Sequence, residues 1–284
     1  MKNNIIIWFF GFCLFSNSIF ANHLAVSCDD LKCDEPLSQK LIQNGVKYET
    51  SKAIIWVEKG SLTQEEIHQF GTLVEQGITN IEKFLKNNLD VKKSSGRKLQ
   101  YFVSPKIDVS HVYYKDLKGL YDPKLFMPSQ RVKDHNAPYL HETAHILAGD
   151  NSEWFSEGFA SYIESYVSEN MGGYSAHIFD LDGNKGIDEQ AAKAIRTKAG
   201  KAAIQLIGDN EKTLSLSSND QTLRAAAYVL YQSAVKFLIK NVSLEKTMQI
   251  YREKGTEKSF NEVTNHTLEE WKTKWIQHLT TGNK

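Results

Sequence analysis

The middle of the chain reads His141-Glu142-Thr143-Ala144-His145, and Glu157 follows twelve residues after the second histidine. Two histidines four apart on a helix lie about 6 Å apart along its axis and on one face, so both imidazoles can reach one metal ion. Glu142 lies about 100° further round the helix, where it can hold a metal-bound water without becoming a ligand. A catalytic zinc ion takes three protein ligands and leaves a fourth position for water. We therefore predict one Zn²⁺ ion held by His141, His145 and Glu157.

Capping residues place the two histidines inside a helix. Asn136 is a suitable N-cap and Pro138 fits a first helical turn, which predicts a helix that begins near Ala137. Gly149 is suited to end that helix, because glycine readily adopts the left-handed conformation of a C-terminal cap. Both histidines then lie within regular helix.

A second helix is predicted directly after the first. Asp150-Asn151-Ser152 offers N-cap candidates, and Glu153 is placed for a capping box with Asp150. The polar residues Glu157, Ser161 and Glu164 share one face of this helix, and its buried side is formed by Trp154, Phe155, Phe159, Tyr162 and Ile163. Two antiparallel helices joined by so short a turn can bring Glu157 back beside both histidines.

These two stretches resemble the core of the gluzincin zinc metallopeptidases. Residues 156–164, Ser-Glu-Gly-Phe-Ala-Ser-Tyr-Ile-Glu, are similar to the Asn-Glu-Gly-Phe-Ala-x-Tyr-x-Glu signature of aminopeptidase-N-type enzymes. The connector between the two motifs is shorter than in those large enzymes, and in this respect the chain resembles the compact peptidase-MA-like bacterial domains. The similarity extends from about Ile54 to Leu279, and it implies a zinc metallopeptidase.

The resemblance also implies a catalytic tyrosine further along the chain. In aminopeptidase-N-type enzymes a Tyr-x-x-Gly-Ala-x-x-x-x-x-Leu helix carries a phenol that hydrogen-bonds the oxyanion. Residues 228–238 have the same tyrosine-to-leucine spacing, which places Tyr228 at the catalytic position. Tyr231 stands where the family has glycine, so Tyr231 stays open as the alternative. A plain apolar stripe on this helix is a third interpretation.

These residues predict the hydrolysis of a peptide bond. Zinc lowers the pKa of a bound water toward about 7 and polarises the scissile carbonyl. Glu142 would accept the proton of that water and pass it to the leaving amine. Glu164, two turns after Glu157, is either a partner that orients a histidine ligand or a solvated charge.

The first residues have the pattern of a secretory signal peptide. Lys2 is a short basic start, residues 5–15 form an apolar run, and Ser16 to Ala21 form a more polar end with a small residue at the expected cleavage point. The apolar run is too short to span a bilayer comfortably, and a retained N-terminal anchor is the alternative. We therefore predict a signal peptide over residues 1–21, a secreted or periplasmic protein, and no stable membrane insertion after cleavage.

Residues 22–50 show little periodicity and are predicted to form an N-terminal extension. Cys28 and Cys33 would pair there as a disulfide in an oxidising compartment, and a zinc-binding pair is the alternative. The chain carries 34 basic and 34 acidic residues, a balance that offers no electrostatic attraction to nucleic acid. The predicted partner is a peptide or protein substrate.

Hydrophobic periodicity predicts one α+β domain over residues 51–284. We expect a small mixed β-sheet lobe followed by a mostly helical lobe, with the active-site helices at their junction. The resemblance to gluzincins implies that this fold is zincin-like. The predicted strands are 53–57, 99–103 and 109–114, and the predicted helices outside the two motifs are 62–89, 189–207, 221–240, 244–254 and 268–279, the last capped by Thr267.

Residues 119–131 stand where zincin-like folds place the edge strand that lines the cleft. Pro128 favours an edge, because proline cannot donate a hydrogen bond into a central ladder. An edge strand there could bind an extended peptide through backbone hydrogen bonds. A surface loop is the alternative.

Two other functions remain open. One is an enzyme that acts on a non-protein amide, such as a cell-wall peptide bond. The other is a secreted zinc-containing binding module with little or no catalytic activity. Glu142 counts against the second, because a structural zinc site is normally closed by a fourth protein ligand and needs no general base. The Gly-x-Met-Glu-Asn motif with which aminopeptidase-N-type enzymes capture a free amine does not precede His141. Its absence favours cleavage within chains or a specialised substrate.

Overall fold

The structure, a computed structural model, describes residues 30–89, 97–117, 120–149, 151–176, 183–208, 220–253 and 255–281. A lobe that contains a small sheet is followed by a helical lobe, so the fold is mixed α+β as predicted. The predicted signal peptide and Cys28 lie outside the described residues, as does the side chain of Cys33. Within the described ranges, no helix has both the length and the apolar character needed to cross a membrane.

The sheet holds five strands: β1 (Val46–Glu49), β2 (Ala53–Val57), β3 (Leu99–Ser104), β4 (His111–Leu117) and β5 (Leu120–Pro128). Their order is β1-β2-β3-β5-β4, in which β2, β3 and β5 run parallel while β1 and β4 are antiparallel edges. Parallel strands covered on both faces are expected to be almost continuously apolar. The sequences of β2 (Ala-Ile-Ile-Trp-Val) and β3 (Leu-Gln-Tyr-Phe-Val-Ser) fit this rule, and both strands were predicted.

The prediction of the edge strand was wrong. Residues 119–131 were expected at the edge, but β5 pairs with β3 on one side and with β4 on the other, so β5 is internal. Pro128 is the last residue of β5, opposite Ser104, where the ladder ends and a missing donor disrupts no further pairing. The free edge nearest the metal helices therefore belongs to β4.

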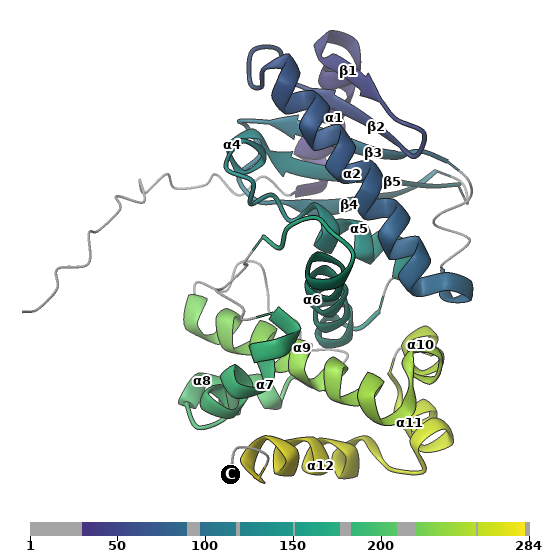
Figure 1. Cartoon of the computed structure of the whole chain (residues 1–284), viewed down its shortest axis with the longest axis vertical. Helices are drawn as coiled ribbons and strands as arrows, with labels where there is room; N and C mark the ends of the chain where they lie inside the picture. Colours follow the sequence, from purple (N-terminus) through teal and green to yellow (C-terminus); the bar gives the residue numbers. More distant parts are fainter. Residues whose placement is uncertain are drawn as a thin grey trace, which may run out of the picture.

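Helices cover both faces of the sheet (Figure 1). One face packs against α2 (Gln64–Leu85) and α5 (Tyr139–Ala148), and α2 begins with a capping box between Thr63 and Glu66. The other face packs against α1 (Asp30–Asn44), where Leu41 joins Phe102 and Phe126 in a second, smaller core. Short helices η1 (Lys86–Asn88) and α4 (Ser129–Lys133) follow α2 and β5.

The sequence did not predict α1 and β1 as elements. Apolar residues on α1 are few, and Pro36 lies inside the helix, so the periodic signal is weak. Part of its contact with the sheet is polar: the buried Lys124 of β5 donates hydrogen bonds to Glu35 at 2.8 Å and to Ser38 at 2.9 Å. Such contacts leave no trace in a hydrophobic pattern.

The helical lobe follows α6 (Glu153–Asn170), which lies with α5 between the two lobes (Figure 1). Its helices are α7 (Gly183–Ala194), α8 (Lys198–Ile204), α9 (Gln221–Val242), α10 (Leu244–Arg252), α11 (Glu257–Thr264) and α12 (Leu268–Thr281). The predictions for α9, α10 and α12 are confirmed, including the cap of α12, where Thr267 and Glu270 form reciprocal hydrogen bonds.

The single helix predicted over 189–207 is two helices. Thr197 interrupts it, because its hydroxyl accepts from the amide of Gly200 at 2.9 Å and so caps α8. The two helices meet closely at that point: a Cβ on Gly200 would lie 1.9 Å from the carbonyl oxygen of Ala194. The periodicity continues across this break, which is why the sequence pattern missed it.

Candidate metal centre

Helix α5 presents His141, Glu142 and His145 at the junction of the lobes. The helix begins later than predicted, because Pro138 is its N-cap and no side chain caps it. The predicted cap, Asn136, instead accepts a hydrogen bond from Arg131 Nε at 3.4 Å. The predicted end is confirmed, since Gly149 follows the last helical residue with a φ of 95°.

The turn after α5 is braced by helix α10. Tyr251 donates its phenolic hydrogen to the carbonyl of Gly149 at 2.7 Å, and the side-chain amide of Asn151 donates to the carbonyl of Tyr251. Ser152 is the N-cap of α6 but makes no side-chain capping bond. The predicted capping box between Asp150 and Glu153 cannot be compared, because Asp150 lies outside the described residues. The braced turn sends α6 back along α5 in the opposite direction.

Three side chains converge where α5 and α6 meet. His141 Nε2 lies 3.1 Å from His145 Nε2 and 3.1 Å from Glu157 Oε2, and His145 Nε2 lies 3.6 Å from Glu157 Oε1. Tetrahedral zinc bonds of about 2.0–2.2 Å hold neighbouring ligand atoms about 3.3 Å apart. These donor types and separations fit one ion, and the group is the one set of its kind in the described part of the chain that could hold a metal.

Each imidazole has a polar neighbour at its other ring nitrogen, and that of His145 is a hydrogen-bond partner. His145 Nδ1 forms a 2.9 Å hydrogen bond with Ser156 Oγ, and His141 Nδ1 lies 3.6 Å from Glu164 Oε2. Glu164 is buried and held in place, since its Oε1 accepts from the amide of Ala176 at 2.6 Å. Partners of this kind fix the ring orientation and direct Nε2 toward a metal. The structure thus brings Glu164 to His141, while Ser156 is a site residue that the sequence interpretation missed.

The charges of the cluster favour a bound cation. Burial alone would raise the pKa of Glu157, but the adjacent imidazoles of His145 and His141 hold it well below its usual range. Burial alone would lower the pKa of His141, but Glu157 and Glu164 raise it well above its usual range. An ionised carboxylate is therefore kept in a largely buried position, where a metal ion could replace the protons as its partner.

Glu142 takes no part in these contacts among the ligands. The residue is 7% exposed, and its carboxylate makes no hydrogen bond or ion pair with any described residue. Burial raises its pKa, against the opposing effect of the His141 and His145 imidazoles. A buried carboxylate with a raised pKa, and with no partner in the described part of the chain, is suited to accept a proton during catalysis.

Helix α9 approaches the centre because α6 carries a glycine next to its ligand. A Cβ on Gly158 would lie 2.5 Å from the carbonyl oxygen of Tyr231, so the two helices pack with that backbone in contact. The ring of Tyr228 stacks against His141 with 6.2 Å between centroids, and its phenol hydrogen-bonds Glu157. Tyr231 lies one turn further along and is buried in the core. Of the two candidate tyrosines, the structure brings Tyr228 to the ligands.

The phenol of Tyr228 keeps its proton. Burial, followed by the nearby carboxylates of Glu157 and Glu142, raises the pKa of Tyr228 well above its usual range. A protonated phenol can donate a hydrogen bond to an oxygen that gains negative charge. The alternative interpretation of this helix as a plain apolar stripe does not account for the contact with Glu157.

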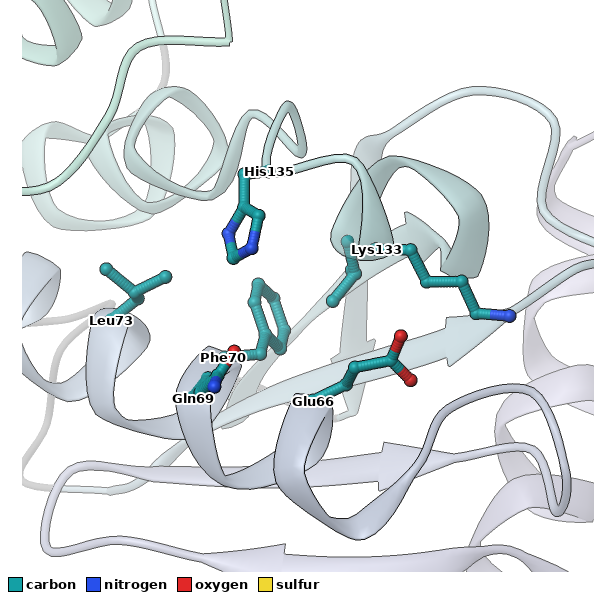
Figure 2. A pocket seen from close by; sticks show the side chains of 7 residues that line it. Glu66, Gln69, Phe70, Leu73, Lys133 and His135 are labelled. Carbon is teal, nitrogen blue, oxygen red and sulfur yellow. The ribbon is translucent and has the colours of Figure 1, made fainter.

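A small cavity lies elsewhere, between α2 and α4 (Figure 2). Phe70, Leu73 and His135 line it together with polar side chains that include Glu66. No residue of the His141, His145 and Glu157 group lines this cavity. The cavity is therefore separate from the metal centre.

Comparison of the chain with protein-family models and with curated proteins finds no match to either. The case for a function accordingly depends on the residues of the site and on their geometry.

Proposed function

We propose that the chain is a zinc-dependent metallopeptidase, related to the gluzincin, peptidase-MA-like enzymes that its motifs resemble. The observation that carries this proposal is the convergence of His141, His145 and Glu157 on one point, next to Glu142, whose carboxylate has no partner among the described residues. A structural zinc site normally has four protein ligands. Three ligands and an adjacent base are the set that a hydrolytic site requires.

Each residue has a separate role in this proposal. His141 and His145 use Nε2, and Glu157 uses its carboxylate, to hold the zinc ion. Bound zinc would supply Lewis-acid polarisation of the scissile carbonyl and a lowered pKa for water. Glu142 accepts the proton of the attacking water and delivers it to the leaving amine. Tyr228 donates a hydrogen bond to the oxyanion.

The substrate would lie along strand β4. This strand is the free edge of the sheet on the side of β5, and it contacts helix α5, which carries the general base. An extended peptide can add to a free edge through backbone hydrogen bonds. An antiparallel edge strand beside the metal helix also supports a zincin-like fold.

The pattern of residues 1–21 supports export, so we propose that the enzyme acts in a secreted or periplasmic location on peptide or protein substrates. The acidic and basic residues balance, and nothing in that balance favours a nucleic-acid partner.

A direct test combines metal analysis with cleavage of an unfolded protein such as casein. Wild-type protein is expected to contain about one zinc per chain and to lose activity when a chelator removes it. Glu142→Gln should retain zinc and lose roughly 10²- to 10⁴-fold in turnover, because the variant lacks only the proton acceptor. Glu189→Gln, which changes an exposed glutamate of α7, is the matched control and should behave as wild type.

Two results would contradict the proposal. If Glu142→Gln hydrolysed the substrate at the wild-type rate, Glu142 could not be the general base. Retention of zinc without hydrolysis of a broad peptide library would favour the binding module instead.

A further inference from the structure

A turn over residues 171–176 follows α6 and lies against the buried Glu164 of that helix. The amide of Ala176 donates to Glu164 Oε1 at 2.6 Å, and the hydroxyl of Ser175 donates to the same oxygen at 3.3 Å. The other carboxylate oxygen, Oε2, lies 3.6 Å from His141 Nδ1. The turn therefore holds one oxygen of Glu164 and leaves the other facing the imidazole of a predicted zinc ligand.

The turn is anchored to two other helices. Asn80 of α2 donates from its side-chain amide to the carbonyl of Met171 at 3.0 Å. The ring of Tyr174 packs against that of Tyr139, the first residue of α5, with 5.1 Å between centroids. The position of the turn, and with it the position of the Glu164 carboxylate, depends on these contacts.

Two glycines in the turn have similar backbones and different surroundings. Gly172 has a φ of 101° and Gly173 a φ of 105°, values that favour glycine at both positions. A Cβ on Gly172 would lie 2.7 Å from Nε2 of Gln76, which is the end of an exposed, flexible side chain. A Cβ on Gly173 would lie 2.5 Å from the phenolic oxygen of Tyr139, a side chain that is 1% exposed. Gln76 can move aside, whereas Tyr139 is fixed in the core, so a methyl group at position 173 forces the turn away from α5.

A shift of the turn would reach the metal centre through Glu164. A group that contacts the second ring nitrogen of a ligating histidine sets the orientation and basicity of the ring, and its loss typically lowers metal affinity by about 10- to 100-fold. Glu164 is 3% exposed, so solvent does not readily replace the amide of Ala176 when the turn moves.

We propose that Gly173 is a positioning residue of the metal centre. Its lack of a side chain lets the turn lie against Tyr139, and the turn in that place holds Glu164 in the orientation that supports His141 as a zinc ligand. The inference rests on the zinc site of the proposed function, but it does not depend on the reaction that the site catalyses.

The matched pair Gly173→Ala and Gly172→Ala tests the inference, with zinc affinity measured by competition with a fluorescent chelator. Gly173→Ala should lower the affinity by about 10- to 100-fold, whereas Gly172→Ala should stay close to wild type. Both variants should unfold at a lower temperature than wild type, because alanine disfavours a positive φ. The pair therefore separates backbone strain, which the two variants share, from the contact with Tyr139.

Two double variants test the route of the effect. Tyr139→Phe combined with Gly173→Ala should restore most of the zinc affinity, because the next atoms that the Cβ meets are Leu140 Cδ1 at 3.5 Å and the Cζ of residue 139 at 3.7 Å. Glu164→Ala combined with Gly173→Ala should bind zinc no more weakly than Glu164→Ala alone, because two changes that act through one contact are not additive.

A milder variant keeps the test decisive if Gly173→Ala fails to fold. Ser175→Ala removes one donor to Glu164 without changing the backbone preference of the turn. It should lower zinc affinity by less than Gly173→Ala, because the amide of Ala176 still holds the carboxylate. Wild-type affinity in Ser175→Ala would then contradict the role of the turn.

The outcomes separate this inference from the function on which it rests. Wild-type zinc affinity in Gly173→Ala, equal losses in the two glycine variants, or no recovery with Tyr139→Phe each overturns the role of Gly173 and leaves the zinc site in place. The expected affinities without peptide hydrolysis by wild type would support the role of Gly173 and overturn the peptidase function alone. A wild-type protein that binds no zinc overturns both.

Discussion

The metal centre and a second polar cluster in the helical lobe both place charged groups inside helical packing, yet they differ in how their atoms are paired. In the second cluster Asp188 of α7 accepts from Ser233 at 2.9 Å and from Lys236 at 2.6 Å, and Ser233 accepts from Trp275 Nε1 at 3.1 Å. Each carboxylate oxygen of Asp188 has a donor. We call this group of four side chains the Asp188 cluster.

In the metal centre, the polar atoms are not each paired with a donor or acceptor in this way. Two imidazole nitrogens face each other at 3.1 Å, one carboxylate is shared between them, and Glu142 has no partner among the described residues. Buried polar groups are normally satisfied within the protein, whereas the ligand atoms of this cluster point toward one position, where they could hold a metal ion. We therefore expect substitutions in the Asp188 cluster to change the stability of the fold, and substitutions in the metal centre to change metal binding or catalysis.

The largest expected effect is on catalysis. Tyr228→Phe removes the phenolic donor but keeps the ring beside His141, and we expect roughly a 10²- to 10³-fold loss of turnover, the size found when one oxyanion donor is removed. Zinc content and the free energy of unfolding should stay close to wild type. Steady-state kinetics with metal analysis measures both, and Tyr231→Phe is the matched control. Equal losses in the two variants would contradict the assignment to Tyr228.

A second prediction concerns metal affinity. Ser156→Ala removes the hydroxyl that orients His145 through Nδ1, and we expect zinc affinity to fall by about 10- to 100-fold. Competition with a fluorescent zinc chelator measures this change. Ser168→Ala, at a partly exposed position of the same helix, serves as control. Unchanged affinity in Ser156→Ala would show that the ring orientation does not depend on this contact.

The Asp188 cluster should respond in the opposite way. Asp188→Asn weakens the ion pair with Lys236, and we expect a loss of about 1 kcal/mol in the free energy of unfolding, because both side chains are partly exposed and solvent screens the pair. Zinc affinity should not change. Urea unfolding with metal analysis tests the pair of expectations. If Asp188→Asn lost zinc affinity but kept its free energy of unfolding, the expected difference between the Asp188 cluster and the metal centre would be contradicted.

The smallest expected effect concerns His111, a histidine outside the His141, His145 and Glu157 group. His111 places Nδ1 2.9 Å from the carbonyl of Val109 and Nε2 2.8 Å from Asp34 of α1, so both ring nitrogens face acceptors and the charged imidazolium is favoured. Burial lowers its pKa, but the hydrogen bonds to Asp34 and Val109 outweigh burial, and the pKa of His111 is raised.

A raised pKa in the folded state determines the sign of the pH dependence. The stabilisation from His111 is fully present below its unfolded pKa of about 6.5 and is lost as the pH rises through the folded value. The free energy of unfolding of metal-free protein should therefore fall between about pH 5.5 and pH 8.5 by more in wild type than in Asp34→Asn. Equal slopes in the two proteins would contradict the ion pair.

The sequence predicted the site better than it predicted the connections around the site. Histidines four apart and Glu157 on the next helix were sufficient to predict convergence, because helix geometry fixes their positions once the chain turns back. Ser156 was missed, since a serine beside a ligand has no spacing signal of its own. The cap at Asn136 was wrong, because Arg131 engages that side chain instead.

The fold was predicted where burial is continuous and missed where contacts are polar or local. Strands β2 and β3 are apolar along most of their length and were predicted, whereas α1 meets the sheet partly through Lys124 and gave no periodic signal. The position of β5 inside the sheet depends on its pairing with both β3 and β4, a long-range property that Pro128 alone could not reveal.

The central claim is that His141, His145 and Glu157 bind one metal ion together, and a crystal structure of zinc-loaded protein with anomalous scattering at the zinc edge tests it most directly. The account expects one zinc peak per chain, about 2.0–2.2 Å from both Nε2 atoms and from a carboxylate oxygen of Glu157, with no fourth protein ligand. A zinc-loaded crystal with no peak at this position, or with Glu157 turned away from the ion, would contradict it.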